Sequence, residues 1–116
     1  MKENINIRDI DYDNKNVIEK AFEYKRTQII KLLIDYLNDI NILNFKGENL
    51  IQIALSYENM EIFDYLLDSN INLNNQDFEH GITILHYSII LGNEEVYNKL
   101  LNKDINYTIN DKNGIS

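Results

Sequence analysis

The stretch Gly81-Ile-Thr-Ile-Leu-His-Tyr-Ser88 decides the fold, because the chain carries related copies of it. The second copy is Gly47-Glu-Asn-Leu-Ile-Gln-Ile-Ala54, and the first is Asn14-Lys-Asn-Val-Ile-Glu-Lys-Ala21. The copies begin 33 and 34 residues apart, and a fourth opens 33 residues later at Gly114-Ile-Ser116. A fixed period of this length is typical of stacked supersecondary units, each of which buries its apolar side against the next. The sequence therefore predicts a repeat protein without an enclosed active site.

The copies resemble the ankyrin repeat, a pattern that opens with G-x-T-P-L-H-x-A and later reaches a pair of leucines. The third copy fits best, with Ser88 in place of the pattern's alanine. The family's Asp-Val-Asn segment is similar to Asp39-Ile40-Asn41 and Asn72-Leu73-Asn74. The resemblance covers the chain from about Asp11 to Ser116. The matching positions of the third copy are Gly81, Thr83, Leu85, His86, Gly92, Val96, Leu100 and Leu101.

This resemblance implies an all-α solenoid in which helix-turn-helix pairs are joined by β-turn-like fingers. The chain then forms a single domain over residues 1–116, with one residue inserted near Phe78 to His80. Residues 1–10 are a cap or a divergent preceding repeat. The implied repeats are residues 11–43, 44–76 and 77–110, followed by the truncated start of a fourth at 111–116.

Two departures from the family pattern affect the expected stability. The chain has no proline, so the family's helix-starting proline is replaced by apolar residues. The mid-repeat glycine, which relieves strain at the end of the first helix, remains only as Gly92. Lys25 and Glu58 stand at the other two positions. We therefore expect repeats that are less stable than a consensus array.

Capping residues and apolar spacing predict the same helices without the family pattern. Asn16, Asn49 and Thr83 are good N-cap residues, and each precedes an apolar run. Apolar side chains recur at helical spacing in the second half of each unit. The first helices are expected at about residues 17–24, 50–57 and 84–91. The second helices are expected at about residues 27–36, 60–69 and 94–102.

Composition narrows the class of protein and of partner. The chain has 116 residues, a formal net charge of −8 and no cysteine. The acidity argues against nucleic acid, whose phosphates need clustered Lys and Arg. No apolar run approaches the roughly 20 residues of a membrane span, and the N-terminus lacks a signal-peptide core. We therefore expect a cytoplasmic protein that binds neither nucleic acid nor membrane.

No catalytic or metal-binding constellation stands out. Asp9, Asp11 and Asp13 alternate like the first ligands of a calcium loop, but Asn14 and Lys20 stand where that loop needs Gly and Glu. His80 and His86 are the only histidines, and the resemblance gives His86 a structural role. No Ser/His/Asp set, phosphate-binding glycine loop or carboxylate pair is recognisable. We expect no enzyme activity, no metal and no cofactor.

The period instead arranges large side chains in two columns on the face that ankyrin-like stacks use for partners. Aromatic anchors dominate interface energies, so such columns are typical of a binding groove. On the polar turns, exposure of the rings is favoured; for Tyr24 and Tyr57, exposure and packing remain open. The column at the turn tips is Tyr12, Phe45 and Phe78. The column at the ends of the first helices is Tyr24, Tyr57 and Leu91.

Charged side chains accompany these columns, and acids outnumber bases. The hypothesis is a partner with apolar anchors in a basic surround. The alternative is a solvated rim without specific contacts. The complete set of candidate partner-binding residues is Tyr12, Asp13, Tyr24, Phe45, Lys46, Glu48, Tyr57, Phe78, Glu79, His80, Ile82 and Leu91.

These observations favour a non-catalytic protein-interaction module that binds through a concave groove of turn tips and first helices. One alternative is an acidic inhibitor or immunity-type protein that neutralises a basic enzyme or toxin. Another is a structural segment of a longer repeat array. The last helix pair lacks a polar capping repeat, so its outer face is also a candidate surface for self-association.

Overall fold

The computed structural model describes residues 16–37 and 39–112 of the chain. Within these residues the structure is all-α, as predicted, and no strand is assigned. Both ends of each helix lie within two residues of their expected positions, and the largest difference is at the C-terminal end of the fourth helix. The six helices of this part are α1 (Val17–Glu23), α2 (Thr27–Tyr36), α3 (Leu50–Ser56), α4 (Met60–Leu67), α5 (Ile84–Leu91) and α6 (Glu94–Leu101).

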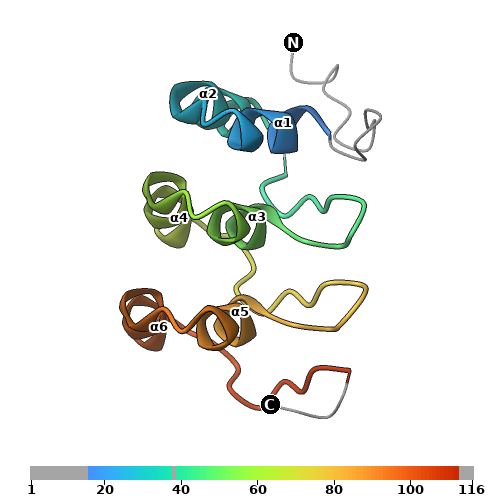
Figure 1. Ribbon diagram of the computed structural model, residues 1–116, viewed down its shortest axis with the longest axis vertical. Coiled ribbons are helices and arrows are strands. Elements are labelled where there is room, and N and C mark those ends of the chain that lie inside the picture. Colours follow the sequence, from blue (N-terminus) through green and yellow to red (C-terminus); the bar gives the residue numbers. More distant parts are fainter. Residues whose placement is uncertain (1–15, 38, 113–116) are drawn as a thin grey trace.

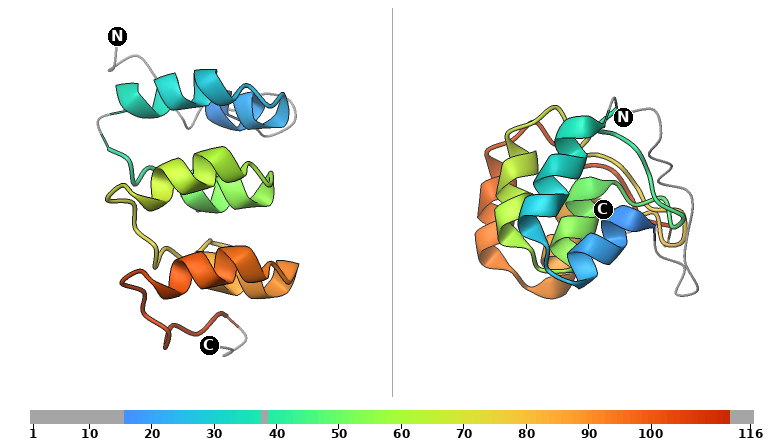
Figure 2. Two further views of the ribbon diagram at one scale, coloured as in Figure 1. Left: turned by 90° about the vertical axis from the view of Figure 1, so that its left-hand side faces the viewer. Right: turned by 90° about the horizontal axis from the view of Figure 1, so that it is seen from above.

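The helices form three antiparallel pairs that stack along the long axis of the molecule (Figure 1). The first helices α1, α3 and α5 form an inner layer beside the projecting loops, and α2, α4 and α6 form an outer layer. Seen from above, the pairs overlie one another and the loops project to the same side (Figure 2). Contacts between layers and between successive pairs, such as α3 with α5 and α2 with α4, hold the stack together.

Each inner helix begins with a capping box, in which two residues exchange side-chain and backbone hydrogen bonds. In α1 the Glu19 backbone N–H donates to Asn16 Oδ1 at 2.8 Å. In α5 the Thr83 backbone N–H donates to His86 Nδ1 at 3.0 Å. The three predicted N-cap residues are confirmed. His86 thus fills the capping position in its own repeat.

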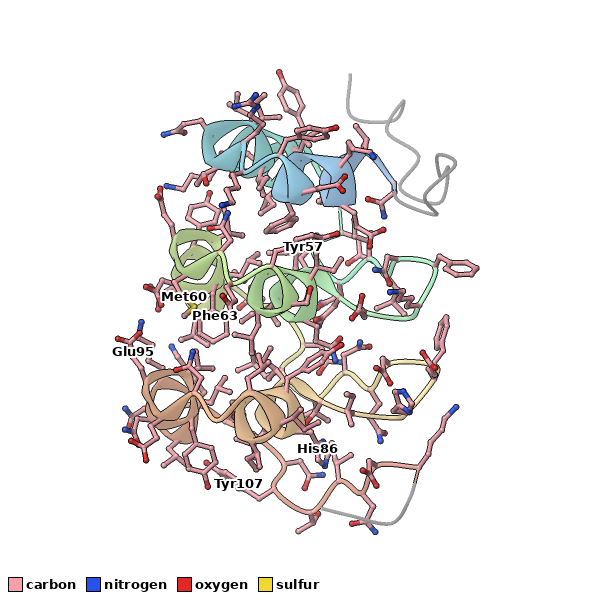
Figure 3. All side chains as sticks on the ribbon, in the orientation of Figure 1. Tyr57, Met60, Phe63, His86, Glu95 and Tyr107 are labelled. Carbon is pink, nitrogen blue, oxygen red and sulfur yellow. The ribbon has the colours of Figure 1, made fainter. Side chains whose placement is uncertain are left out.

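The apolar stripes of the helices merge into one core between the pairs. Phe22, Leu55 and Phe63 are almost completely buried, and they come from three different helices. Figure 3 shows Phe63 in the layer between α4 and α6. Because each pair buries its apolar sides only against its neighbours, the stability of the array lies in these layers.

Asparagine side chains connect the loops that follow the outer helices. The Asn74 N–H donates to Asn72 Oδ1, and the Thr108 N–H donates to Asn106 Oδ1, both at 2.9 Å. Between repeats, the Asn72 N–H donates to Asn41 Oδ1 at 2.6 Å, and the Asn106 N–H donates to Asn74 Oδ1 at 2.9 Å. These hydrogen bonds give a physical reason for the Asp39-Ile40-Asn41 and Asn72-Leu73-Asn74 segments, because their side-chain oxygens satisfy backbone donors of irregular loops.

The turns between the paired helices adopt a left-handed backbone in all three repeats. Gly92 has φ +67°, and the residues at the corresponding positions, Lys25 and Glu58, have φ +60° and +55°. A side chain in this region brings Cβ close to the backbone and costs about 1–2 kcal/mol. The predicted loss of the mid-repeat glycine therefore leaves two strained turns, and the backbone keeps the repeat geometry at both.

Replacing Lys25 or Glu58 by glycine is expected to raise the free energy of unfolding by about 0.5–1 kcal/mol each, because glycine removes this strain. Urea unfolding followed by circular dichroism measures the change. Asn102→Gly is the control, since Asn102 caps α6 at φ −87°, where glycine relieves nothing. A loss of stability in both Lys25→Gly and Glu58→Gly would contradict the strain account.

Candidate partner-binding face

Within the described residues, two complete fingers project beside the inner helices, and we name them after their first residues. In the Asn44 finger (residues 44–48), the Asn44 N–H donates to the Glu48 carbonyl at 2.9 Å. In the Asp77 finger (residues 77–82), the Asp77 N–H donates to the Ile82 carbonyl at 3.1 Å. The Asp77 finger encloses one more residue than the Asn44 finger, which is where the sequence predicts an insertion.

One side chain at the base organises each finger. Asn44 Oδ1 accepts from the N–H groups of Lys46 and Glu48 at 3.0 and 2.9 Å. Asp77 Oδ1 accepts in the same way from the N–H groups of His80 and Ile82, at 2.9 and 3.2 Å. Asn and Asp favour turns because a short side-chain acceptor replaces a backbone one. The fingers are therefore preformed by local hydrogen bonds.

The two phenylalanines of the fingers are each more than half exposed. Phe78 is also held against the preceding finger, because its N–H donates to the Lys46 carbonyl at 2.9 Å. Its ring covers Gly47 so closely that a Cβ added to this glycine would lie only 2.4 Å from a ring carbon. Phe45 and Phe78 therefore both belong to the surface of the Asn44 finger.

The contact between successive fingers recurs at the next repeat. In the next repeat, the Lys112 N–H donates to the His80 carbonyl at 2.8 Å, as the Phe78 N–H does to the Lys46 carbonyl. Lys112 is thus the structural counterpart of Phe78, and in the two fingers Phe45 and Phe78 each directly follow the residue that organises the turn. The inserted residue shifts the register between the fingers by one position. Tyr12 and Asp13 lie outside the described residues.

The second column divides into exposed and packed members. Tyr24 is more than half exposed, with Lys20 Nζ 5.9 Å from its ring centroid, and Leu91 is also exposed. Tyr57 stacks on Phe22 with ring centroids 5.8 Å apart and an interplanar angle of 14°. Figure 3 places Tyr57 in the layer between α1 and α3. Tyr57 is therefore a packing residue, whereas Tyr24 is open to solvent.

Two predicted contact residues are corrected by their burial. The Glu48 side chain is buried, because its carboxylate accepts from Asn44 Nδ2 at 3.0 Å and from Tyr87 Oη at 2.8 Å. Ile82, the last residue of the Asp77 finger, is buried, and its carbonyl accepts from Gln52 Nε2 at 3.0 Å. Neither side chain is available to a partner in this structure. The exposed charged residues of the fingers are Lys46, Glu79 and His80.

Glu48 belongs to a buried polar network that sequence reasoning missed. Asn44 Nδ2 donates to Glu48 Oε1 and to Glu19 Oε2, both at 3.0 Å, and all three side chains are buried. Burial and the hydrogen bond to Glu48 raise the pKa of Tyr87 well above its usual range. The network joins α1, the Asn44 finger and α5, and thus all three repeats. A Glu at the third position of α1, where the other repeats have Gln52 and His86, was the available sequence signal.

Neither a metal site nor a membrane span is apparent in the described residues. Within them, no group of three or more His, Cys, Asp or Glu side chains is placed to hold a metal ion. The alternating Asp9, Asp11 and Asp13 lie outside this part of the chain. Over the same residues, no helix combines the length and apolar character that crossing a bilayer requires.

Comparison with known proteins agrees with the repeat architecture. A family model for ankyrin repeats, in three copies, matches residues 18–111. No curated protein matches the chain.

Proposed function

The chain belongs to the ankyrin repeat family, whose members are generally protein-interaction modules, and we propose that it is a non-catalytic module that binds a partner protein through its fingers. We call the surface formed by Phe45, Lys46, Phe78, Glu79 and His80 the fingertip face. The observation that carries the proposal is the pair of exposed phenylalanines on preformed turns. Aromatic side chains at such positions are typical anchors of an interface.

The anchors are held before any partner arrives. Phe78 is fixed by its backbone hydrogen bond to Lys46 and by the contact of its ring with Gly47. The Asn44 side chain fixes the turn that carries Phe45 and Lys46. Preorganisation reduces the conformational entropy lost on binding, so these rings can contribute to affinity with little ordering cost.

Charge distribution favours apolar anchoring over the acidic-inhibitor alternative. The fingertip face carries Lys46 as well as Glu79, and Glu79 Oε1 lies 3.5 Å from His80 Nε2. Many exposed acids lie instead on the outer helices, such as Glu61 and Glu94. We expect partner affinity to depend weakly on salt. A steep loss of affinity with salt would favour the acidic inhibitor and a basic partner.

Replacing both Phe45 and Phe78 by alanine is expected to weaken partner binding at least about 30-fold, because loss of an interface anchor costs about 2 kcal/mol or more. The partner is first recovered from lysate with the native chain, and its affinity is then measured by titration calorimetry. The matched control is Leu32→Ala/Ile90→Ala, which removes two apolar side chains that are also more than half exposed and lie outside the fingers.

Both double variants are checked by circular dichroism for native helix content. Tyr57 is left unchanged, because its stacking on Phe22 would mix a loss of stability with a loss of binding. Equal affinity of the finger variant and the native chain would contradict the proposal. A loss of affinity confined to the control variant would place the binding surface outside the fingers.

A further inference from the structure

The side of the last helix pair that faces away from the second pair has the composition of an internal interface between pairs. We call Leu85, Ile89, Tyr97 and Leu101 the C-end face. Every counterpart of these four residues in the two preceding pairs is buried. Ile89 is 58 % exposed, whereas its counterparts Leu55 and Phe22 are 0 % and 2 % exposed. The difference arises because a helix pair follows Leu55 and Phe22 in the stack, and none follows Ile89 in the described structure.

A shallow cleft gives this face a defined shape. It has a volume of about 200 Å³ and is lined by Leu85, Ile89, Tyr97 and Tyr107, among others. Figure 3 shows Tyr107 on the side of the last helix pair that faces away from the second pair. An apolar surface of this kind on a folded domain generally marks an interaction site.

The first helix pair presents the other half of the same interface. We call Val17, Ile29 and Leu33 the N-end face. Val17 is 53 % exposed, whereas its counterpart Leu50 is 0 % exposed, and Ile29 is 50 % exposed against 0 % for Ile62. Inside the molecule, the counterparts of the N-end face are covered by the preceding helix pair. The counterparts of the C-end face are covered by the following helix pair. The two end faces are therefore complementary by the same residue pattern that the chain uses twice internally.

The edge positions that form ion pairs between the second and third helix pairs are uncharged at both end faces. Between internal pairs, Asp64 Oδ1 lies 2.8 Å from Lys99 Nζ, and Asp68 Oδ1 lies 3.5 Å from Lys103 Nζ. The counterparts of the two acids at the C-end edge are Asn98 and Asn102. The counterparts of the two lysines at the N-end edge are Leu32 and Tyr36, both well exposed.

We propose that copies of this chain associate head to tail, with the C-end face of one copy on the N-end face of the next. The contact repeats the internal interface, so the second copy takes the place of the next helix pair. Such an interface is heterologous and leaves a free end face on each side, so the stack grows with concentration. The fingers project to one side of the stack, and association would extend their row (Figure 2). The proposal is independent of the binding function of the fingertip face.

Two single substitutions at opposite ends test the geometry. Ile89→Glu blocks only the C-end face, and Ile29→Glu blocks only the N-end face. The native chain should show a weight-average mass that rises with concentration beyond the dimer in sedimentation equilibrium. Each variant alone should remain monomeric. An equimolar mixture should form a dimer that does not grow, because it contains one intact pair of complementary faces.

Ile90→Glu is the matched control, because Ile90 is exposed beside Ile89 but its counterparts Ser56 and Glu23 are exposed as well. This variant should associate like the native chain. Association should strengthen with salt, since salt screens the repulsion between copies of net charge −8. A native chain that stays monomeric at every concentration would overturn the proposal. Dimers of Ile29→Glu alone would also overturn it, because they require contact between two C-end faces.

Discussion

Asn44→Asp is expected to lower the free energy of unfolding by about 3–5 kcal/mol, the range observed when a buried charged group loses its partner. The substitution changes one amide nitrogen into an oxygen. In the native chain that nitrogen donates to Glu19 Oε2 and Glu48 Oε1, each at 3.0 Å. In the variant, three carboxylates would meet in a buried site without a donor between them. A three-repeat protein has little stability to lose, so much of the population could unfold.

The third repeat provides the control for this prediction. Asp77 occupies the position of Asn44 in the Asp77 finger, and its Oδ1 accepts from two backbone N–H groups as Asn44 Oδ1 does. A carboxylate can therefore hold a finger, and Asp77→Asn should change stability by less than about 1 kcal/mol. Tyr87→Phe removes a single donor to Glu48 and should cost about 1–2 kcal/mol.

Urea unfolding of the three variants separates the contribution of the amide from that of the turn. The expected order of stability is Asp77→Asn, then Tyr87→Phe, then Asn44→Asp. An Asn44→Asp variant as stable as Asp77→Asn would show that the amide bridge between Glu19 and Glu48 contributes little.

The fold could be predicted from sequence because its determinants are local and repeated. Asn16, Asn49 and Thr83 mark helix starts through hydrogen bonds that span three residues. The apolar stripes that follow recur with the same period, so three weak signals support one assignment. The family model over residues 18–111 confirms that assignment. Helix ends were less certain, because terminal turns fray and lack a strong signal.

The candidate face was harder to predict because it depends on contacts between repeats. Phe78 lies beside Gly47 of the preceding finger, and the sequence locates the two turns without showing which of their residues meet. The sequence predicts that Glu48 is a surface charge, and only its contacts with Asn44 and Tyr87 show that it is buried. Tyr24 and Tyr57 occupy equivalent positions, but within the described residues only Tyr57 has a preceding pair, with Phe22, on which to stack. These differences arise from position in the stack, which a repeat pattern alone does not encode.

The contact between the two fingers leads to a second prediction, which concerns both stability and the binding face. Gly47→Ala is expected to lower the free energy of unfolding by about 2 kcal/mol, because two costs combine. Gly47 has φ +78°, so a Cβ is strained there, and that Cβ would lie 2.4 Å from the Phe78 ring. Phe78 must then leave its place on the Asn44 finger. We expect partner binding to weaken although both phenylalanines are still present.

A double-mutant cycle isolates the ring contact from the backbone strain. Gly92→Ala places the same Cβ at φ +67°, where no atom lies within 4 Å, and should cost only about 1 kcal/mol. In a Phe78→Ala background the ring is absent, so Gly47→Ala should also cost only about 1 kcal/mol, which corresponds to a coupling of about 1 kcal/mol. Urea unfolding of the four chains of the cycle measures this coupling. A coupling near zero would mean that the Phe78 ring moves aside without loss, and that Gly47 does not fix the anchor in place.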